Sequence, residues 1–535
     1  MANKAKFQAI KGTRDLLPPE TELWARVESV AREVFGTYAF GEIRPPIFEP
    51  TELFARAVGG ETDIVSKEMY TFEDHSLGWL EVVRSQAILQ TQILTKGPVL
   101  STPTETLLPH SIAAINSFVT GCVDLVQKGE VPKTPENLSA LSSIEAGLNS
   151  LLAVTNSTPG HERNALLERI RESLELIQFG DVLSLRPEAT ASVCRAYIEH
   201  NMNQWPAPVK LYYCGPMFRR ERPQKGRYRQ FYQIGAEVLG GTDAPGIDAE
   251  VIEMVMAFFE KLELPGVVLE INSIGHSGAD AEGKPVCRRA YVEALRAVLQ
   301  QVKDKLGADS QRRIETNPLR VLDSKLESEQ GTIAGLPKTG EYLCEECKTH
   351  YAELKRQLDL RGVKYRENWR LVRGLDYYMR TTFEITAQGL GSQNAVCGGG
   401  RYDGLIELLG GPPTKGIGFA IGEDRLILSL QEAGKAAAAP GRDVYIAWMG
   451  DKAAATAIAA ARKLRDAGLR VELPAVAQKF GKALGMADRL GARWALILGD
   501  DEVSSGRWTV KTLGDGSQEK VSEGELVAWL KRKVE

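Results

Sequence analysis

The chain has 535 residues, 43% of them hydrophobic and 25% charged, with a formal net charge of −4 and seven cysteines. This composition predicts several domains with ample cores. It excludes a generally basic nucleic-acid-binding protein but leaves room for a local cationic RNA site. Sparse cysteine, the lack of a secretory leader and the lack of an apolar run long enough to cross a membrane indicate a protein of the reducing cytoplasm.

The first 75 residues predict a helix and two strands. A helical pattern follows the segment 11–18 and continues through Phe35. Residues 41–48 are typical of a strand at a sheet or subunit edge, where their prolines are tolerated. Residues 69–74 predict a further strand.

Residues 76–180 carry apolar positions at helical spacing, in three stripes. We interpret them as a small helical bundle inserted at the tip of a hairpin, whose ends, Asp74 and Gly180, should lie close together. The segment is slightly acidic and has no catalytic cluster, so a tolerated surface insertion is the alternative. The stripes are Leu108, Ile112, Ile115, Val119, Cys122 and Val126; Leu138, Leu141, Ile144, Leu148, Leu151 and Leu152; and Leu166, Leu167, Ile170, Leu174 and Ile177.

The segment 212–237 predicts a strand, a cationic loop and a returning strand. Guanidinium groups bind phosphate oxygens in a bidentate manner, so the loop suits a polyphosphate or the end of a nucleic acid. Phe231 offers a flat face for a base. The charged loop residues are Arg219, Arg220, Arg222, Lys225, Arg227 and Arg229, with one acid, Glu221. A solvated charged hairpin is the alternative.

On the returning strand Gln233, Gly235 and Glu237 share one face. They present an amide and a carboxylate, and the glycine between them should leave room for a small ligand. Four further blocks accompany this hairpin: LRPEATA at 185–191, LVRGLDYY at 371–378, GGRYDG at 399–404 after Gly398, and GIGFAIGEDR at 416–425. The last predicts a buried strand that turns into a helix near Glu423.

Residues 265–365 are predicted to be mostly helical. Cys344 and Cys347, with His350 and the distant Cys287, have the spacing of metal ligands. A zinc site would require all four groups to converge, and separate thiols are the alternative. After a linker of small residues at 436–441, strands and helices alternate as β-α-β-α-β, which predicts a separate α/β domain with a partly parallel sheet.

The segment 212–237 resembles motif 2 of class II aminoacyl-tRNA synthetases, in the form found in the histidyl-tRNA synthetase family. Residues 371–378 resemble the histidine-specific block of that family, 416–425 its motif 3 and 41–48 its motif 1. The resemblance covers nearly the whole chain apart from the insertion. It implies an α/β (α+β) fold in which an antiparallel catalytic sheet has flanking helices. The implied parts are 1–75, 181–264 and 366–435 (catalytic core), 76–180 (helical insertion), 265–365 (family insertion domain near the tRNA acceptor arm) and 436–535 (anticodon-binding domain).

The resemblance further implies an ATP-dependent, AMP-forming ligase that activates L-histidine and charges histidine tRNA. It implies a homodimer, Mg²⁺ on the ATP and no covalent nucleophile. Two alternatives are a non-catalytic histidine-sensing regulatory paralogue and a pseudo-synthetase module that binds uncharged tRNA. Such paralogues lack the anticodon-binding domain and the catalytic arginines, whereas this chain has the domain and retains Arg219, Arg373 and Arg425.

Residue roles follow from the same resemblance. Arg219 and Arg373 are expected to act on the α-phosphate, with Glu423 near the Mg²⁺. Position 189 is alanine where the family usually has glycine, and we expect its methyl group to be accommodated. For Tyr402 the alternative is core packing, and for Glu188 and Glu237 it is a buried salt bridge. The expected histidine-binding set is Glu188, Ala189, Thr190, Gln233, Glu237, Tyr377, Tyr378 and Tyr402; the ATP set is Arg219, Glu221, Arg227, Phe231 and Arg425; the tRNA acceptor set is Gln224 and Arg229.

Overall fold

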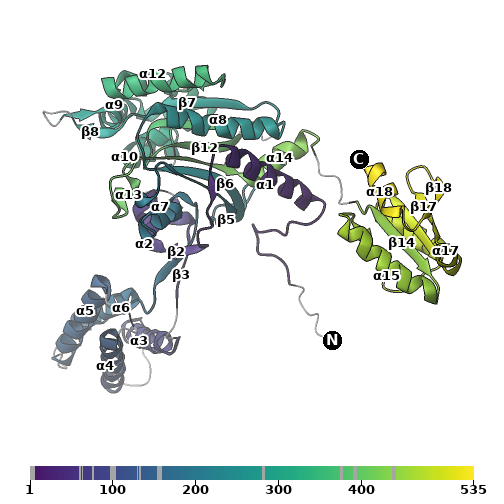
Figure 1. The fold of residues 1–535 in the computed structure, drawn as a ribbon. Coiled ribbons are helices and arrows are strands. Elements are labelled where there is room, and N and C mark those ends of the chain that lie inside the picture. The colour runs from purple at the N-terminus through teal and green to yellow at the C-terminus, as the bar shows by residue number, and fades with distance from the viewer. Residues whose placement is uncertain are drawn as a thin grey trace. The chain divides into compact units, whose positions relative to one another are not determined.

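The computed structural model describes residues 7–59, 62, 64–74, 78–96, 104–128, 131, 134–153, 160–279, 284–373, 377–388, 394–435 and 441–534. The chain forms two compact units, one containing Ala31–Ser429 with the residues up to Arg14, the other containing Asp15–Val30 and Leu430–Glu535. Figure 1 shows the elements of both. In the described part of the chain, no helix is long and apolar enough to cross a bilayer.

The larger unit is built on an eight-stranded sheet in the order β1-β5-β6-β13-β12-β11-β7-β10. The six inner strands pair antiparallel, while β1 and β10 pair parallel at the edges. The predicted antiparallel catalytic sheet is therefore confirmed. Its strands are β1 (Gly41–Glu42), β5 (Val209–Phe218), β6 (Gln230–Leu239), β7 (Val268–Ser273), β10 (Arg366–Glu367), β11 (Met379–Thr386), β12 (Ala395–Arg401) and β13 (Gly416–Gly422).

A second sheet of the larger unit has the order β2-β4-β3, with β2 at Phe48–Pro50, β3 at Tyr70–Glu73 and β4 at Val182–Leu185. The prediction of β3 is confirmed. The prediction of one strand over 41–48 is wrong, because β1 ends at Glu42 and β2 begins at Phe48. The two prolines between them have no N–H to donate to a ladder, so the chain leaves one sheet before it joins the next.

Helices flank the main sheet. The ring of Phe35 packs against Phe258 and Phe419 at centroid distances of 5.7 and 5.8 Å, which joins two helices to the sheet in one aromatic core. The helix predicted to run through Phe35 is confirmed, and so is the strand-to-helix turn at Glu423. The helices are α1 (Glu20–Thr37), α2 (Thr51–Val58), α7 (Thr190–Glu199), α8 (Pro245–Lys261), α13 (Leu405–Leu408) and α14 (Glu423–Glu432).

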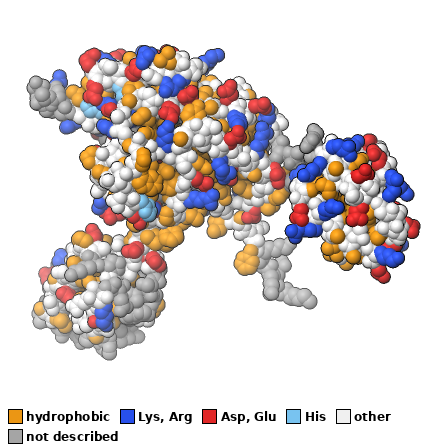
Figure 2. All heavy atoms as spheres, in the orientation of Figure 1, with side chains coloured by type: hydrophobic (Ala, Val, Ile, Leu, Met, Phe, Trp, Pro, Cys, Tyr) orange, Lys and Arg blue, Asp and Glu red, His pale blue; other side chains and the backbone are white. Residues whose placement is uncertain are grey.

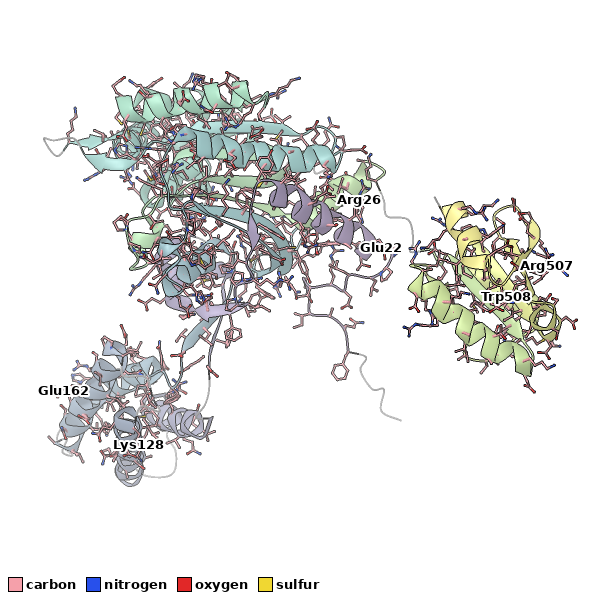
Figure 3. The ribbon with its side chains drawn as sticks, viewed as in Figure 1. Glu22, Arg26, Lys128, Glu162, Arg507 and Trp508 are labelled. Carbon is pink, nitrogen blue, oxygen red and sulfur yellow. The ribbon has the colours of Figure 1, made fainter. Side chains whose placement is uncertain are left out.

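The described residues of the inserted segment form four helices, α3 (Gly78–Lys96), α4 (Thr104–Lys128), α5 (Pro135–Leu152) and α6 (Gly160–Leu176). The three stripes share one hydrophobic core, so the predicted bundle is confirmed. Two stripe positions were predicted wrongly: Leu138 and Leu152 are 43% and 66% exposed, because each lies at the margin of the apolar face of α5. The side chain of Leu108 lies outside the described residues. Figure 3 labels Lys128 and Glu162 on this bundle.

The two ends of the insertion lie side by side, as predicted. The backbone N–H of Asp74 donates to the Asp181 carbonyl at 3.0 Å, directly beyond the β3–β4 pairing. The Glu73 carboxylate accepts from the backbone N–H groups of Phe179 and Gly180. The bundle therefore extends from an otherwise ordinary hairpin.

Residues 265–365 are mostly helical, as predicted, with a short hairpin of β8 (Ser277–Ala279) and β9 (Pro285–Val286) before the first helix. A core of apolar side chains, including Leu295 and Ile333, holds these helices together. The helices are α9 (Cys287–Gln301), α10 (Ala308–Thr316), α11 (Glu327–Ala334) and α12 (Glu345–Leu360).

The C-terminal domain has the predicted β-α-β-α-β order, followed by a short helix, a hairpin and a final helix. Its sheet order is β15-β14-β16-β17-β18, in which the first three strands are parallel and the last two antiparallel. Trp508, labelled in Figure 3, is buried in the core of this domain. The elements are β14 (Val444–Met449), α15 (Asp451–Asp466), β15 (Val471–Glu472), α16 (Phe480–Arg489), β16 (Trp494–Gly499), α17 (Asp500–Ser505), β17 (Arg507–Thr512), β18 (Gln518–Ser522) and α18 (Leu526–Val534).

Candidate active site

A buried carboxylate, Glu237, lies on β6 near the middle of the main sheet. Its side chain is 1% exposed and accepts hydrogen bonds from the hydroxyl groups of Thr190, at 2.7 Å, and Tyr402. Burial raises the pKa of Glu237 to about 8, although the two hydroxyl groups act in the opposite direction. Among the described residues no Lys or Arg pairs with it, so the salt-bridge alternative does not hold for Glu237.

The Glu188 carboxylate accepts hydrogen bonds at the start of helix α7. Its two carboxylate oxygens accept from the backbone N–H groups of Thr190 and Ala191 at 2.7 and 3.0 Å. Burial nevertheless raises the pKa of Glu188. Within the described chain Glu188 forms no ion pair, although the charge of Arg219 lowers its pKa in part, so the salt-bridge alternative fails here as well. The backbone φ of Ala189 is −110°, and its methyl group is buried in the apolar cluster of this unit. The fold therefore accommodates a methyl group at position 189.

Three tyrosine rings form one wall beside Glu237. The rings of Tyr377 and Tyr378 are 4.7 Å apart, and Tyr402 meets Tyr377 edge-on at 5.7 Å. Tyr402 does more than fill the core, because its hydroxyl group donates to Glu237. Residues 374–376 of the predicted histidine-specific block lie outside the described residues.

The space above Gly235 is occupied, contrary to our expectation that it receives a ligand. Tyr213 is the β5 partner of Gly235, and a methyl group at Gly235 would overlap the Tyr213 ring and hydroxyl group. The glycine is thus needed for the tyrosine. The Tyr213 side chain was missed from the sequence, because an aromatic residue in a strand is more often plain core.

Several polar atoms in this region are buried without a partner among the described residues. They are the Tyr213 hydroxyl group, Gln233 Oε1 and Arg373 Nε. Buried polar atoms are almost always hydrogen-bonded, and each exception calls for an explanation. Three exceptions close to Glu237 in the fold are typical of a pocket that completes its hydrogen bonds with a bound polar ligand.

Arg373 forms an ion pair with Glu384 of β11 at 3.1 Å, and its guanidinium lies 5.8 Å from the Tyr378 ring centre. Gly398 makes this position possible, since a methyl group there would overlap the guanidinium. Glu384 was not among the predicted site residues. The available signal was the lone acid of a strand whose other residues, apart from Arg380, are apolar or threonine, and which pairs with the glycine strand β12.

The cationic loop carries the other arginines. The Arg219 guanidinium donates to the Pro187 carbonyl at 3.0 Å and lies 5.3 Å from the Phe231 ring centre. Across the loop, Arg227 pairs with Glu221 at 3.1 Å. Burial and the nearby Arg227 both lower the pKa of Arg425. Such a concentration of positive charge around few acids favours an anionic ligand.

The loop rests on the N-terminal segment, which our sequence analysis did not assign to the site. The backbone N–H of Arg229 donates to the Gly12 carbonyl at 2.7 Å, and Arg14 pairs with Asp424 at 3.1 Å. Asp424 also accepts from the backbone N–H of Tyr232 at 2.9 Å. Arg229 is consequently half-buried, whereas Gln224 at the tip of the loop is exposed.

A cavity of about 720 Å³ opens beside the Arg373–Glu384 pair. Its walls include Glu384 of the sheet, Asp323 and Lys325 of the 265–365 region, and Arg370, which follows that region in the chain. The volume is large enough for a nucleotide-sized group.

The metal-ligand prediction was wrong in one member. Cys287, Cys344 and Cys347 do converge, but their histidine is His276. His350 lies one turn farther along α12, where its Nε2 contacts the Asp243 carbonyl at 3.1 Å. Three residues of helix displace a side chain by about 4.5 Å along the axis, which takes His350 away from the thiols.

Two family models match successive parts of the chain. Residues 163–426 match the family model of histidyl-tRNA synthetase, and residues 443–533 match that of the anticodon binding domain. Similar curated proteins include the histidine–tRNA ligases of Koribacter versatilis, 44% identical with 98% of this chain and 96% of that protein covered, and of Solibacter usitatus, 42% identical with 98% and 99% covered.

Among solved structures, apo histidyl-tRNA synthetase of S. aureus is 30% identical, with a TM-score of 0.64 and coverage of 98% of this chain and 100% of that one. The matches run through the buried Glu237, the cationic loop and the C-terminal sheet domain. The chain therefore belongs to the histidyl-tRNA synthetase family, whose members are aminoacyl-tRNA ligases.

Proposed function

We propose that this protein is a histidine–tRNA ligase whose reaction is carried by the residues around Glu237 and the cationic loop. It activates L-histidine with ATP, releases pyrophosphate and transfers histidine from the adenylate to the 3′ end of histidine tRNA. The observation that carries the proposal is the buried Glu237 carboxylate, which is held by Thr190 and Tyr402 on the sheet whose β5–β6 loop carries Arg219 and Arg227.

Histidine binds with its imidazole between Glu237 and Tyr378. A site that hydrogen-bonds both ring nitrogens rejects amino acids that lack them, because its buried polar groups would stay unpaired. The α-amino group lies at Gln233, Thr190 and Glu188. The partnerless Oε1 of Gln233 supports this position, since an ammonium group would supply its missing donor.

ATP lies across the cationic loop, with adenine against Phe231 and Glu221. A histidine carboxylate oxygen attacks the α-phosphorus, the bond to the bridging oxygen breaks, and its electron pair leaves with pyrophosphate. Both reactants are anionic, so Arg219 and Arg373 lower the barrier by neutralising charge at the α-phosphate, while Arg227 and Arg425 hold the outer phosphates. No side chain forms a covalent bond in this scheme.

Mg²⁺ is implied by ATP use, and the donor set fits it. Mg²⁺ prefers oxygen ligands and usually takes only one or two carboxylates beside phosphates and water. Glu423, buried at the start of α14, and Glu384 offer such oxygens. When bound, the ion would neutralise charge on the phosphate oxygens.

Two other classes of protein fit less well. A histidine-sensing paralogue would need the histidine pocket alone, whereas this chain keeps Arg219, Arg373 and Arg425 and an anticodon binding domain. A module that only binds uncharged tRNA would not need the Arg373–Glu384 pair or the buried Glu237.

The proposed macromolecular partners are histidine tRNA and a second copy of the chain. Lys479 and Lys482 of the C-terminal domain are exposed, and Figure 2 shows Lys and Arg side chains over its visible face. For the homodimer, Ile47, Phe48 and Phe72 are 45%, 54% and 43% exposed on the β2-β4-β3 sheet, where Figure 2 shows gathered hydrophobic side chains. Exposed apolar patches of this kind mark protein interfaces.

The proposed location is the reducing cytoplasm. Seven free thiols support it.

ATP–pyrophosphate exchange tests the activity. We expect exchange with histidine and none with other amino acids, followed by charging of histidine tRNA. Charging should weaken when the tRNA lacks its extra 5′ guanylate, if Gln224 and Arg229 contact that nucleotide. A folded protein that binds histidine but supports no exchange would instead be a sensing paralogue.

Glu237→Gln should weaken histidine binding and change how the stability of the protein depends on pH. The histidine KM should rise at least about tenfold while the ATP KM changes little, because only the contact to the imidazole is altered. The folded-state pKa of Glu237 is about 8, above the ordinary value of 4.5. The free energy of unfolding of the ligand-free protein therefore falls as pH rises from 4.5 to about 8, because the folded state resists ionisation of this carboxyl group. The variant should therefore melt at a higher temperature than the wild type near pH 9, and at a similar temperature near pH 4.5.

The matched control for this test is Glu260→Gln, an exposed exchange of the same chemistry on α8. It should alter neither the KM values nor the pH dependence of melting. Equal rises in the KM of both substrates for Glu237→Gln would mean that Glu237 has a structural role.

Replacing residues 76–179 by a short Gly/Ser turn should leave a dimer that activates histidine at a rate within about threefold of the wild type. The ends already lie together as a hairpin, and a shorter loop costs little closure entropy. Sedimentation and exchange assays would measure this. If the variant dimerises but forms no adenylate, the bundle supports the active site. If it activates histidine but no longer charges tRNA, the bundle contacts RNA.

A further inference from the structure

Four potential metal ligands from three separate segments converge in the 265–365 region. His276 follows β7, Cys287 begins α9, and Cys344 and Cys347 stand at the start of α12. Their ligand atoms, one per residue, all lie within 4.8 Å of one another. Figure 1 shows α9, α12 and β8 together at one end of the larger unit.

The separations fit a tetrahedral ion. His276 Nδ1 lies 3.2 Å from Cys347 Sγ and 3.9 Å from Cys344 Sγ. Zinc with Zn–S near 2.3 Å and Zn–N near 2.05 Å requires N···S separations of about 3.5 Å and S···S separations of about 3.8 Å. The two N···S separations differ from the required value by a few tenths of an ångström, and no separation among the four ligand atoms exceeds 4.8 Å.

The surroundings suit thiolates. The backbone N–H of Cys344 donates to Cys287 Sγ at 3.1 Å, and backbone N–H groups of the first turn of α12 donate to Cys344 Sγ. Such hydrogen bonds stabilise negative sulfur and orient it. Cys287 and Cys347 are buried beside Leu343, away from water.

The backbone is also strained at this point. Cys287 has a φ of +50°, a left-handed conformation that side chains other than glycine seldom adopt. Such a strained conformation is tolerated when the surrounding structure requires it. That conformation turns the Cys287 thiol toward the start of α12, where its sulfur accepts from Cys344.

We propose that His276, Cys287, Cys344 and Cys347 bind one structural Zn²⁺ ion. Three thiolates and one imidazole select zinc over hard cations. Four protein ligands close the coordination shell, so the ion stabilises the fold and takes no part in the reaction.

The site is connected to the histidine pocket. Arg288, next to Cys287, donates to the backbone carbonyl of Tyr378 at 2.8 Å. The segment just before His276 pairs with Arg380, whose N–H donates to the Gly275 carbonyl at 2.7 Å, and Arg380 also pairs with Glu346 between the two cysteines of α12. The zinc therefore positions the Tyr378 carbonyl and the nearby backbone of Arg380 without touching substrate.

Metal analysis of the purified full-length protein tests the site independently of catalysis. We expect about one zinc per chain, and a thiolate-to-metal charge-transfer band after replacement by Co²⁺. His276→Gln and Cys344→Ser should each lose the zinc. The matched controls, His350→Gln and Cys122→Ala, should keep it, because neither residue belongs to the cluster.

Two results would overturn the proposal: wild-type protein that neither contains nor takes up zinc, or a disulfide among the three cysteines in freshly isolated protein. The positioning role has its own readout. His276→Gln should raise the histidine KM at least about fivefold and leave the ATP KM unchanged. A zinc-free variant with an unaltered histidine KM would disprove that role. A wild-type protein that contains zinc but has no activity would contradict the proposed function and leave the zinc site standing.

Discussion

Arg373→His should abolish histidyl-adenylate formation in a protein that still folds. The guanidinium of Arg373 is held by Glu384 at 3.1 Å and by the Tyr378 ring, so in the proposed reaction it would present a preorganised cation to the α-phosphate. Removing one such group typically costs about 3 kcal/mol or more of transition-state stabilisation. We expect histidine-dependent ATP–pyrophosphate exchange to fall by at least about a hundredfold.

Folding of this variant can be checked by melting and by its oligomeric state. Arg356→His is the matched control, because Arg356 is exposed on α12 and pairs only with Glu353 among the described residues. It should retain full exchange activity. Near-normal exchange by a folded Arg373→His protein would contradict the catalytic assignment of this arginine.

Gly398→Ala should reproduce much of the loss of exchange activity expected for Arg373→His, although it changes no reactive group. The atoms that a methyl group at Gly398 would meet first all belong to the Arg373 guanidinium. A flexible side chain can swing away, so the sheet should stay folded while the cation leaves its place. We expect exchange to fall at least about tenfold, because small misplacement of a positioning group is costly.

A double-mutant cycle makes this test specific. If Gly398→Ala acts through Arg373, then adding it to Arg373→His should cost little further activity, since residues in contact are not additive. Gly485→Ala is the control, because an added methyl group meets nothing within 4 Å in helix α16. Fully additive losses would show that Gly398 acts on the strand itself.

Local patterns were enough to predict the main elements. Strands β5 and β6, the strand-to-helix turn at Glu423 and the β-α-β-α-β order of the C-terminal domain all follow from period-two or helical spacing and from turn residues. The insertion was likewise predicted as helices, because its stripes repeat every three or four residues. At the margins of α5 the same reasoning failed for Leu138 and Leu152, since a stripe does not show where a partner helix ends.

Spatial pairing across strands and segments could not be predicted in this way. Glu384 became a site residue because β11 lies beside the glycine strand β12, and Gly235 serves Tyr213 rather than a ligand because the two are partners across β5 and β6. Spacing along one helix favoured His350 as the fourth metal ligand, yet the fold brings in His276 from the end of β7.

The sequence by itself thus determined which chemical groups are present and which local elements carry them, since periodicity and turn residues act over a few positions. Only the tertiary structure decided which groups meet. Contacts such as Arg373 with Glu384, or His276 with Cys347, join residues far enough apart in the chain that no local spacing constrains them. They depend on sheet register and on how three loops close around one point, and both are properties of the packed fold.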